Sequence, residues 1–259
     1  MSGVGGRAQK FPLRLDRVSA PAGTTPSAGA ARRAVPTGIG LDSSDVRKRM
    51  VERLREAGVC SAAVLDAIAA VPRHAFVDAA LVAQAYEDTS LPIGHGQTIS
   101  KPSVVARMIE LLLGGVSAKA NGDLGRVLEI GTGCGYQAAV LSLLAKQVIS
   151  VERLRALHDK ARSALAPLRP SHLRLVYGDG MHGHPPNAPY DSIIAAAGGD
   201  EPAPAWLAQL AVGGRLVCPT RRIGSEQQAL MVIDRTARGH ERHLFEAVHF
   251  VPLKSGLGA

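Results

Sequence analysis

The sequence predicts an α/β fold with one mainly parallel sheet, helices on both faces and antiparallel strands at its C-terminal edge. Three observations predict it. Short apolar runs alternate with helical patterns from residue 126 onward, which is typical of parallel βαβ units. A glycine-rich turn follows the first apolar run, as in doubly wound sheets. The last two runs, 228–235 and 243–253, have no clear helix between them, so we expect them to pair as a hairpin.

The N-terminal part of the chain is expected to hold helices and one shaped loop. A helix is predicted over 45–58, and a second over 61–71, with Ser61 as its N-cap. The segment 91–100 contains proline and two glycines, and we interpret it as a shaped loop without regular structure. Pro102 suits the first turn of the helix that follows.

The C-terminal part alternates between strands and helices. The predicted strands are 126–130, 147–152, 173–179, 190–197 and 214–219. The predicted helices between them are 136–145, 153–168 and 202–210. No helix separates the strands near 173 and 190, and no internal repeat is present.

Composition divides the chain into two parts. Residues 1–41 are rich in Gly, Ala, Pro, Ser and Thr and carry a net charge of +5, out of +8 for the 259-residue chain. Such a segment buries too little apolar surface to offset its ordering entropy, so we expect a disordered basic extension. Residues 42–259 form the predicted folded domain, with the N-terminal helices and the shaped loop in 42–125 and the sheet and C-terminal strands in 126–259.

The same features exclude several functions. No run approaches the roughly 20 apolar residues of a membrane span, and no signal-peptide pattern is present. The three cysteines show neither disulfide nor metal spacing, and His182 and His184 lack further ligands, so no metal site is expected. The domain has no dense basic run, so no nucleic-acid partner is expected. We expect a cytoplasmic protein without a membrane partner, working as a monomer.

The strongest local motif is the turn at 131–135. Gly131, Gly133 and Gly135 follow a strand and precede a helix, so the backbone can turn sharply and approach a ligand. The spacing is G-x-G-x-G and not the G-x-G-x-x-G of dinucleotide sites, and no phosphate-binding lysine follows. A nucleoside without phosphates fits this turn best.

Two acidic residues extend the motif. Glu152 ends the next strand, 21 residues after Gly131, where an acid takes ribose hydroxyls in related folds. Asp179 lies between Gly178 and Gly180 after the strand that follows, where it would face an adenine amino group. An Asp-Gly turn is common, so Asp179 alone is a weak signal.

Seven segments with a common resemblance occur in order along the chain. They are LPIGHGQTISKPSVVARMIELL, VLEIGTGCGYQAAVL, VISVER, GDG, APYDSIIAAAG, LAVGGRLVCP and EAVHFVPL. With these segments the chain resembles the protein-L-isoaspartate O-methyltransferases over roughly residues 43–255. The resemblance implies a Rossmann-like S-adenosylmethionine-dependent methyltransferase fold. It implies methyl transfer from that cofactor to the free α-carboxylate of L-isoaspartyl residues in damaged proteins and peptides, with S-adenosylhomocysteine as product.

The motifs and the resemblance together predict the site residues. The expected cofactor-binding residues are Gln97, Thr98, Ile99, Ser100, Glu129, Gly131, Thr132, Gly133, Gly135, Glu152, Asp179 and Gly180. The resemblance places Ser100 beside the substrate carboxylate, where its hydroxyl would orient that group without acting as a nucleophile. Ser100 is also a candidate N-cap for the helix at Pro102. A carboxylate is ionised at neutral pH, so no general base is required.

Three alternatives remain open at this stage. The first is an S-adenosylmethionine-dependent methyltransferase acting on another substrate, such as a small molecule or rRNA. An N-methyltransferase would show an Asn/Asp-Pro-Pro-aromatic motif where residues 195–199 are Ala-Ala-Ala-Gly-Gly. The second is a binding protein on the same scaffold without catalysis. The third is an NAD-dependent oxidoreductase, which the glycine spacing disfavours.

Overall fold

A computed structural model of the chain describes residues 44–222, 224–225 and 227–258, so the extension predicted at 1–41 lies outside the described residues. Within these residues, seven strands form the main sheet. In chain order they are β3 (Arg126–Ile130), β4 (Gln147–Glu152), β5 (Leu173–Tyr177), β6 (Tyr190–Ala195), β7 (Leu210–Arg221), β8 (Gln228–Thr236) and β9 (Gly239–Val248).

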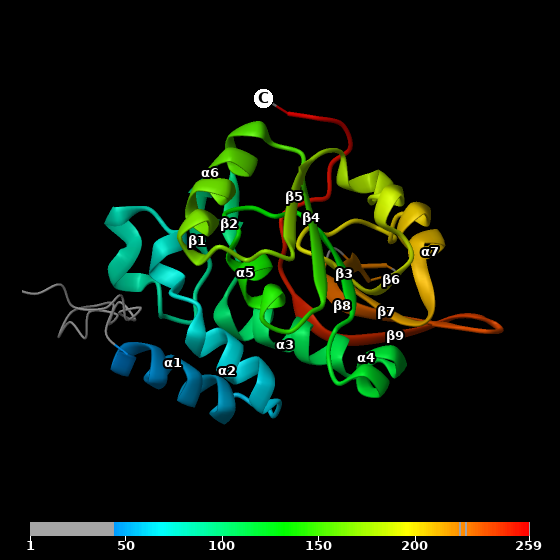
Figure 1. Cartoon of the computed structure of the whole chain (residues 1–259), viewed down its shortest axis with the longest axis horizontal. Coiled ribbons are helices and arrows are strands. Elements are labelled where there is room, and N and C mark those ends of the chain that lie inside the picture. The colour runs from blue at the N-terminus through cyan, green and yellow to red at the C-terminus, as the bar shows by residue number, and fades with distance from the viewer. Residues whose placement is uncertain (1–43, 223, 226, 259) are drawn as a thin grey trace, which may run out of the picture. The chain divides into compact units, whose positions relative to one another are not determined.

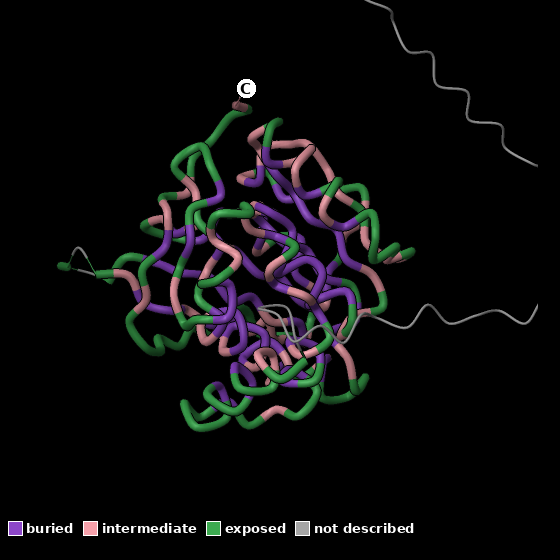
Figure 2. Tube along the Cα trace, turned by 90° about the vertical axis from the view of Figure 1, so that its left-hand side faces the viewer, coloured by how far each residue is buried: buried purple, intermediate pink, exposed green. Residues whose placement is uncertain are grey.

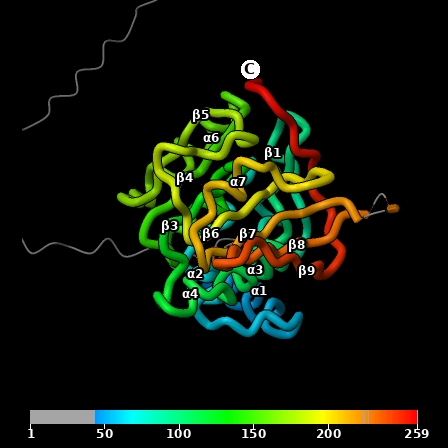
Figure 3. The backbone as a smooth tube through the Cα atoms, turned by 90° about the vertical axis from the view of Figure 1, so that its right-hand side faces the viewer, coloured from blue at the N-terminus to red at the C-terminus, as the bar shows by residue number. Residues whose placement is uncertain are grey.

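The strands lie in the order β5-β4-β3-β6-β7-β8-β9, which can be followed across Figure 3. Pairing is parallel from β5 to β7 and antiparallel from β7 to β9. The predicted mainly parallel sheet with antiparallel C-terminal edge strands is confirmed. β8 starts where the pattern indicated and ends one residue later, whereas β9 begins four residues before the predicted 243 and ends at Val248.

Helices cover both faces of the sheet (Figure 1). They are α1 (Ser44–Glu56), α2 (Ala62–Ala70), α3 (Pro102–Leu113), α4 (Val116–Asn121), α5 (Tyr136–Ser142), α6 (Arg155–Leu165) and α7 (Pro204–Gln209). Neighbouring strand residues alternate between two cores. Val127 and Ile194 pack with the helices α1 to α6, whereas Leu128 and Ile193 pack with Trp206 of α7. Because of this two-residue period, the central strands are buried on both faces. Figure 2 shows the buried residues at the centre of the described chain, with exposed residues around them.

Two of the predicted helix starts are confirmed. Ser61 is the N-cap of α2, and its Oγ accepts a hydrogen bond from the Val64 backbone N–H at 3.4 Å. Pro102 opens α3. None of the helices in the described part of the chain is long and apolar enough to cross a membrane.

The prediction that residues 91–100 lack regular structure was wrong. β1 (Leu91–Gly94) and β2 (Gln97–Ile99) form an antiparallel hairpin. His95 and Gly96 link them with positive φ angles of 53° and 67°, as a two-residue type I′ turn requires. Strands of four and three residues are too short to show a two-residue period. Proline and glycine are also common in loops, so their presence in this segment favoured a loop.

The sheet has one topological switch point. The chain moves outward from β3 through β4 to β5, then returns so that β6 lies on the other side of β3. Connections leaving the carboxyl ends of β3 and β6 therefore diverge and leave a crevice between them. The 131–135 glycine turn follows β3 directly, so it lies at this crevice.

Candidate active site

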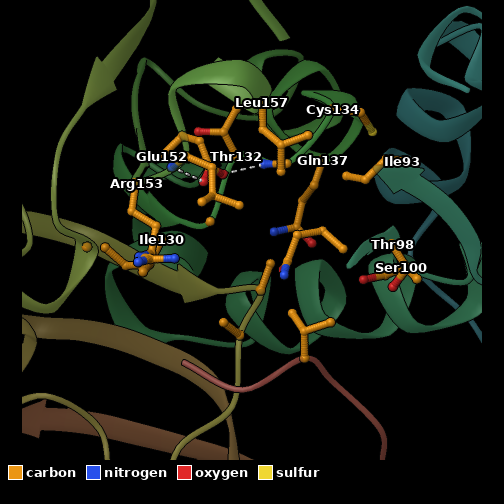
Figure 4. A pocket seen from close by; sticks show the side chains of 18 of the residues that line it. Ile93, Thr98, Ser100, Ile130, Thr132, Cys134, Gln137, Glu152, Arg153 and Leu157 are labelled. Carbon is orange, nitrogen blue, oxygen red and sulfur yellow. Dashed lines mark hydrogen bonds between the residues drawn. The ribbon is translucent and has the colours of Figure 1, made fainter. Parts of the chain in front are cut away.

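A cavity lies at the switch point, between segments that are far apart in the sequence. The glycine turn and the end of β4 form one side, the β1–β2 hairpin forms another, and residues 251–254 of the C-terminal segment complete it. Figure 4 shows Glu152 and Arg153 on one side of the cavity, with Thr98 and Ser100 on the opposite side. The tertiary structure therefore unites the predicted nucleoside motif with the predicted substrate loop.

Most of the predicted site residues line this cavity. They are Gln97, Thr98, Ile99, Ser100, Gly131, Thr132, Gly133, Glu152 and Gly180. Gly131 and Gly133 have positive φ angles of 88° and 57°. A Cβ on Gly133 would come within 3.2 Å of Ile93 Cδ1 in the hairpin, so glycine keeps this approach open.

We call the side of the cavity formed by the glycine turn and the end of β4 the donor side, and the side formed by the β1–β2 hairpin the acceptor side. Glu152 is the central polar group on the donor side. It is 4 % exposed, yet its carboxylate faces the cavity. One oxygen accepts from the Gly133 backbone N–H at 2.9 Å, and the other accepts from Leu154 N–H at 2.9 Å. A carboxylate has about four lone-pair sites, so two acceptor positions remain for a ligand's hydroxyl groups.

Glu129 lies beneath the glycine turn, outside the cavity lining. It is fully buried, and its Oε1 accepts from Gln137 Nε2 at 3.0 Å. Its Oε2 accepts from Ser150 Oγ at 2.5 Å, and that hydroxyl lies 2.5 Å from Thr132 Oγ1. Burial raises the pKa of Glu129 to about 8, with the nearby Glu152 adding to the effect. Its hydrogen bonds thus support Thr132 and Gln137, both of which reach the cavity.

Gly135 also lies outside the lining. Its φ is +93°, and a Cβ there would come within 3.2 Å of Ala161 and closer still to Leu165 in α6. The glycine therefore allows α5 to start close against α6.

Asp179 lies outside the lining as well, and its carboxylate accepts two backbone hydrogen bonds. Oδ1 accepts from Met181 N–H at 2.9 Å, and Oδ2 accepts from Gly256 N–H at 2.6 Å. Desolvation acts to raise the pKa of Asp179, but the two backbone hydrogen bonds, with His182 and Arg153 nearby, outweigh it and lower the pKa. Its neighbour Gly180 reaches the cavity, and its carbonyl accepts from Trp206 Nε1 at 2.7 Å.

Ser100 is not the N-cap that the sequence pattern indicated. Lys101 holds the N-cap position of α3, without a side-chain cap. Asp88 instead accepts from the Ser103 backbone N–H at 2.9 Å and from Ser103 Oγ at 2.8 Å. No protein partner for the Ser100 hydroxyl is found within residues 44–222, 224–225 and 227–258. The hydroxyl lines the cavity and is free to contact a ligand.

Several lining residues were not predicted. Gln137 projects from α5, and Val251 to Lys254 come from the C-terminal segment. The FVPL run belonged to the family resemblance and could have identified this segment. Cys134 also lines the cavity, but burial raises the pKa of its thiol, so a thiolate nucleophile is disfavoured at neutral pH.

The cavity fits S-adenosylmethionine. The Glu152 carboxylate suits ribose hydroxyls and would repel a phosphate placed beside it. The walls at Ile130, Val151 and Leu157 are apolar, as an adenine ring or a sulfur-bearing chain requires. The acid and the apolar walls lie at the switch point of a parallel sheet with an antiparallel edge. Together these features define the class of S-adenosylmethionine-dependent methyltransferases.

Comparison with known proteins specifies the family. Residues 45–258 match the family model described as protein-L-isoaspartate(D-aspartate) O-methyltransferase, and the chain belongs to this family. A relative of that name from Methylibium petroleiphilum is 59 % identical over 264 residues, covering 96 % of this chain and 97 % of the relative. One from Leptothrix cholodnii is 62 % identical over 227 residues, covering 87 % and 79 % respectively.

Solved structures agree in fold. A protein-L-isoaspartate O-methyltransferase superposes with a TM-score of 0.72 at 29 % identity, over 82 % of this chain and 67 % of that one. A putative member from Plasmodium falciparum, in complex with S-adenosyl-L-homocysteine, gives a TM-score of 0.66 at 22 % identity, over 80 % and 98 %. The second likeness bears on the fold alone.

Proposed function

We propose that this chain transfers a methyl group from S-adenosylmethionine to the free α-carboxylate of L-isoaspartyl residues in damaged proteins and peptides, which initiates their repair. The match to the family over residues 45–258 carries the proposal. The geometry supports it, because the nucleoside-type acid Glu152 and the hairpin residue Ser100 face one cavity.

The donor side of the cavity would hold the cofactor. Glu152 would accept ribose hydroxyls, while Gly131 and Gly133 let the backbone approach the ligand closely. Thr132 and Gly180 complete the wall, and Gln137 adds an amide. Glu129, Gly135 and Asp179 would act indirectly, by fixing the turn, the start of α5 and the C-terminal segment.

The acceptor side would hold the substrate carboxylate. S-adenosylmethionine supplies, when bound, a methyl group on a positively charged sulfur whose departure leaves a neutral thioether. The acceptor carboxylate is ionised at neutral pH, so the protein need not remove a proton. The task of Gln97, Thr98 and Ser100 is to orient the carboxylate and to exclude water.

An assay with paired peptides tests the function. The expected result is methyl transfer to a peptide that contains one L-isoaspartyl residue, and none to its aspartyl twin. The reason is that only the isoaspartyl form carries a free α-carboxylate displaced by one backbone methylene. Equal transfer to both peptides, or transfer to neither, would reject this substrate and favour a methyltransferase with another acceptor.

Ser100→Ala tests the orienting hydroxyl. Loss of a hydrogen bond to a charged carboxylate should lower kcat by about tenfold or more, since such bonds contribute about 1.5–3 kcal/mol. The affinity for S-adenosylhomocysteine, measured by calorimetry, should change by less than about threefold, because the hydroxyl contacts the acceptor. Ser103→Ala, which removes one bond to Asp88 outside the cavity, is the matched control. An unchanged kcat in the Ser100 variant would remove this role.

We also propose that the protein acts as a cytoplasmic monomer, without a nucleic-acid partner. The weakly basic domain and the three free cysteines support this proposal. Light scattering of the purified chain would test the monomer. The methyltransferase domain is assigned to residues 42–259, with 1–41 outside it, and the start of the family match at residue 45 supports that boundary.

A further inference from the structure

Arg73 is an unusual buried cation. It lies in the short 3-10 helix η1 (Arg73–Phe76) and is 0 % exposed. Burial lowers the pKa of its guanidinium, but arginine stays protonated in proteins at neutral pH, so Arg73 keeps its charge. A buried charge costs free energy unless its surroundings compensate it, so the groups that contact Arg73 indicate its purpose.

Nε and Nη2 of Arg73 donate hydrogen bonds to the main chain. Nε donates to the Ala85 carbonyl at 2.8 Å, and Nη2 donates to the Ser100 carbonyl at 2.8 Å, with a longer contact of 3.4 Å to Thr89. Within the described part of the chain, no carboxylate accepts a hydrogen bond from it. Arg73 therefore ties the residue that follows β2 to the segment before β1.

The face of the same guanidinium lies over the ring of Tyr136. Its Cζ lies 4.8 Å from the centre of the Tyr136 ring, a cation–π contact. Tyr136 is the first residue of α5 and follows the glycine turn directly. Phe76, from the same turn as Arg73, packs edge-on against the Tyr136 ring at 5.7 Å. One side chain thus contacts both the substrate hairpin and the start of the helix beside the cofactor loop.

We propose that Arg73 is a positioning residue that sets the separation between the Ser100 segment and the glycine turn. This inference rests on the proposed function, because it assigns Arg73 an effect through Ser100. In-line methyl transfer depends steeply on the distance between donor and acceptor. The planar guanidinium donates along its edge and stacks with its face, whereas a lysine ammonium cannot hold both contacts in one geometry.

Other cations near the hairpin provide contrasts. Lys160 Nζ donates to the Ile93 carbonyl at 3.0 Å and to Asp78 at 2.8 Å, so it holds β1 without reaching Ser100. Arg53 Nη2 donates to the Tyr86 carbonyl at 2.7 Å and ties α1 to the same region. Arg53 makes the same type of bond as Arg73, but touches neither Ser100 nor Tyr136. It is therefore the matched control.

A double-mutant cycle tests the proposal. Arg73→Lys should lower kcat with isoaspartyl peptide by about tenfold, while the affinity for S-adenosylhomocysteine changes by less than about threefold. In the Ser100→Ala background, the same change should lower kcat by less than about threefold, because the hydroxyl it positions is gone. Arg53→Lys should leave kcat unchanged in both backgrounds. An equal loss in both backgrounds would overturn the proposal, as would no loss at all.

A spectroscopic readout separates this inference from the function itself. The Ser100 carbonyl precedes the Lys101 amide, so loss of the Arg73 bond should shift the Lys101 amide resonance in the chain without ligand. Arg53→Lys should leave that resonance in place. If Ser100→Ala proves fully active, the orienting role of Ser100 fails, while the Lys101 shift still reports whether Arg73 holds the segment. An unmoved Lys101 resonance would overturn the inference.

Phe76→Leu is a second variant, for use if Arg73→Lys does not fold. Phe76 is buried outside the cavity lining and holds Tyr136 against the η1 turn. Its loss should lower kcat by about threefold, and this loss should vanish in the Ser100→Ala background. Failure of both variants to fold would assign η1 a purely structural role and reject the positioning role.

Discussion

The two sides of the cavity are held in place in opposite ways. On the donor side, an anion holds the loop by its backbone N–H groups: Glu152 accepts from Gly133 and Leu154, and Thr132 contacts Ser150. On the acceptor side, cations hold the hairpin by its backbone carbonyls, with Lys160 at Ile93 and Arg73 at Ser100.

This difference matches what each side must bind. The donor side receives the same small molecule in every turnover, so a preorganised loop loses little entropy on binding. The acceptor side receives a carboxylate within varied polypeptide chains. Anchoring the hairpin by its main chain leaves the Ser100 hydroxyl free for the substrate. Mutations on the donor side should therefore change cofactor affinity, whereas mutations on the acceptor side should change turnover.

Glu152→Ala should produce the largest effect. It removes the carboxylate that would take two ribose hydroxyls and that also holds Gly133 and Leu154. Affinity for S-adenosylhomocysteine should fall by at least about tenfold, since hydrogen bonds to a charged group contribute about 1.5–3 kcal/mol. Calorimetric titration measures this, with Glu52→Gln on exposed α1 as the control. An unchanged affinity would break the comparison at the donor side.

Glu129→Gln tests the buried base of the donor loop. The ordinary pKa is 4.5 and the folded value is about 8, so between these values the unfolded chain releases a proton that the folded chain retains. This carboxyl therefore makes stability fall as pH rises through that window, by at most about 1.4 kcal/mol per pH unit. Glutamine resembles the protonated acid and lacks this loss.

Thermal unfolding at pH 6 and pH 8 measures the effect. The wild-type chain should lose more melting temperature between these two values than Glu129→Gln does. Glu56→Gln, at the exposed end of α1, should behave like the wild type. Identical pH profiles for the wild-type chain and Glu129→Gln would show that Glu129 is already ionised in the folded protein.

Lys160→Met should have the smallest effect, and it tests how the acceptor side is held. It removes the bond to the Ile93 carbonyl, and β1 keeps its pairing with β2. The kcat/KM for isoaspartyl peptide should fall by about threefold, with unchanged affinity for S-adenosylhomocysteine. Lys119→Met, on α4, is the control. A loss of cofactor affinity in the Lys160 variant would show that the two sides are not independent.

Local patterns predicted some features well and others poorly. The glycine turn and Glu152 were found because their spacing along one βαβ unit is a local property. The β1–β2 hairpin was missed because its strands are too short for periodicity. The N-cap role of Ser100 was wrong because Asp88, 15 residues upstream of Ser103, accepts from the Ser103 N–H in the first turn of α3 instead. Arg73 was not predicted, since an arginine before an apolar turn carries no local sign of burial.

The sequence by itself determined the alternation of strands and helices after residue 126, the glycine turn and the acid that follows it, and the family of the chain. These depend on periodicity, on backbone freedom and on motifs within short windows. Only the tertiary structure decided which groups meet: Arg73 with Ser100 and Tyr136, Asp179 with Gly256, and Glu129 beneath the loop. Such contacts join residues up to 77 positions apart. They arise from packing around the whole core, which no local window contains.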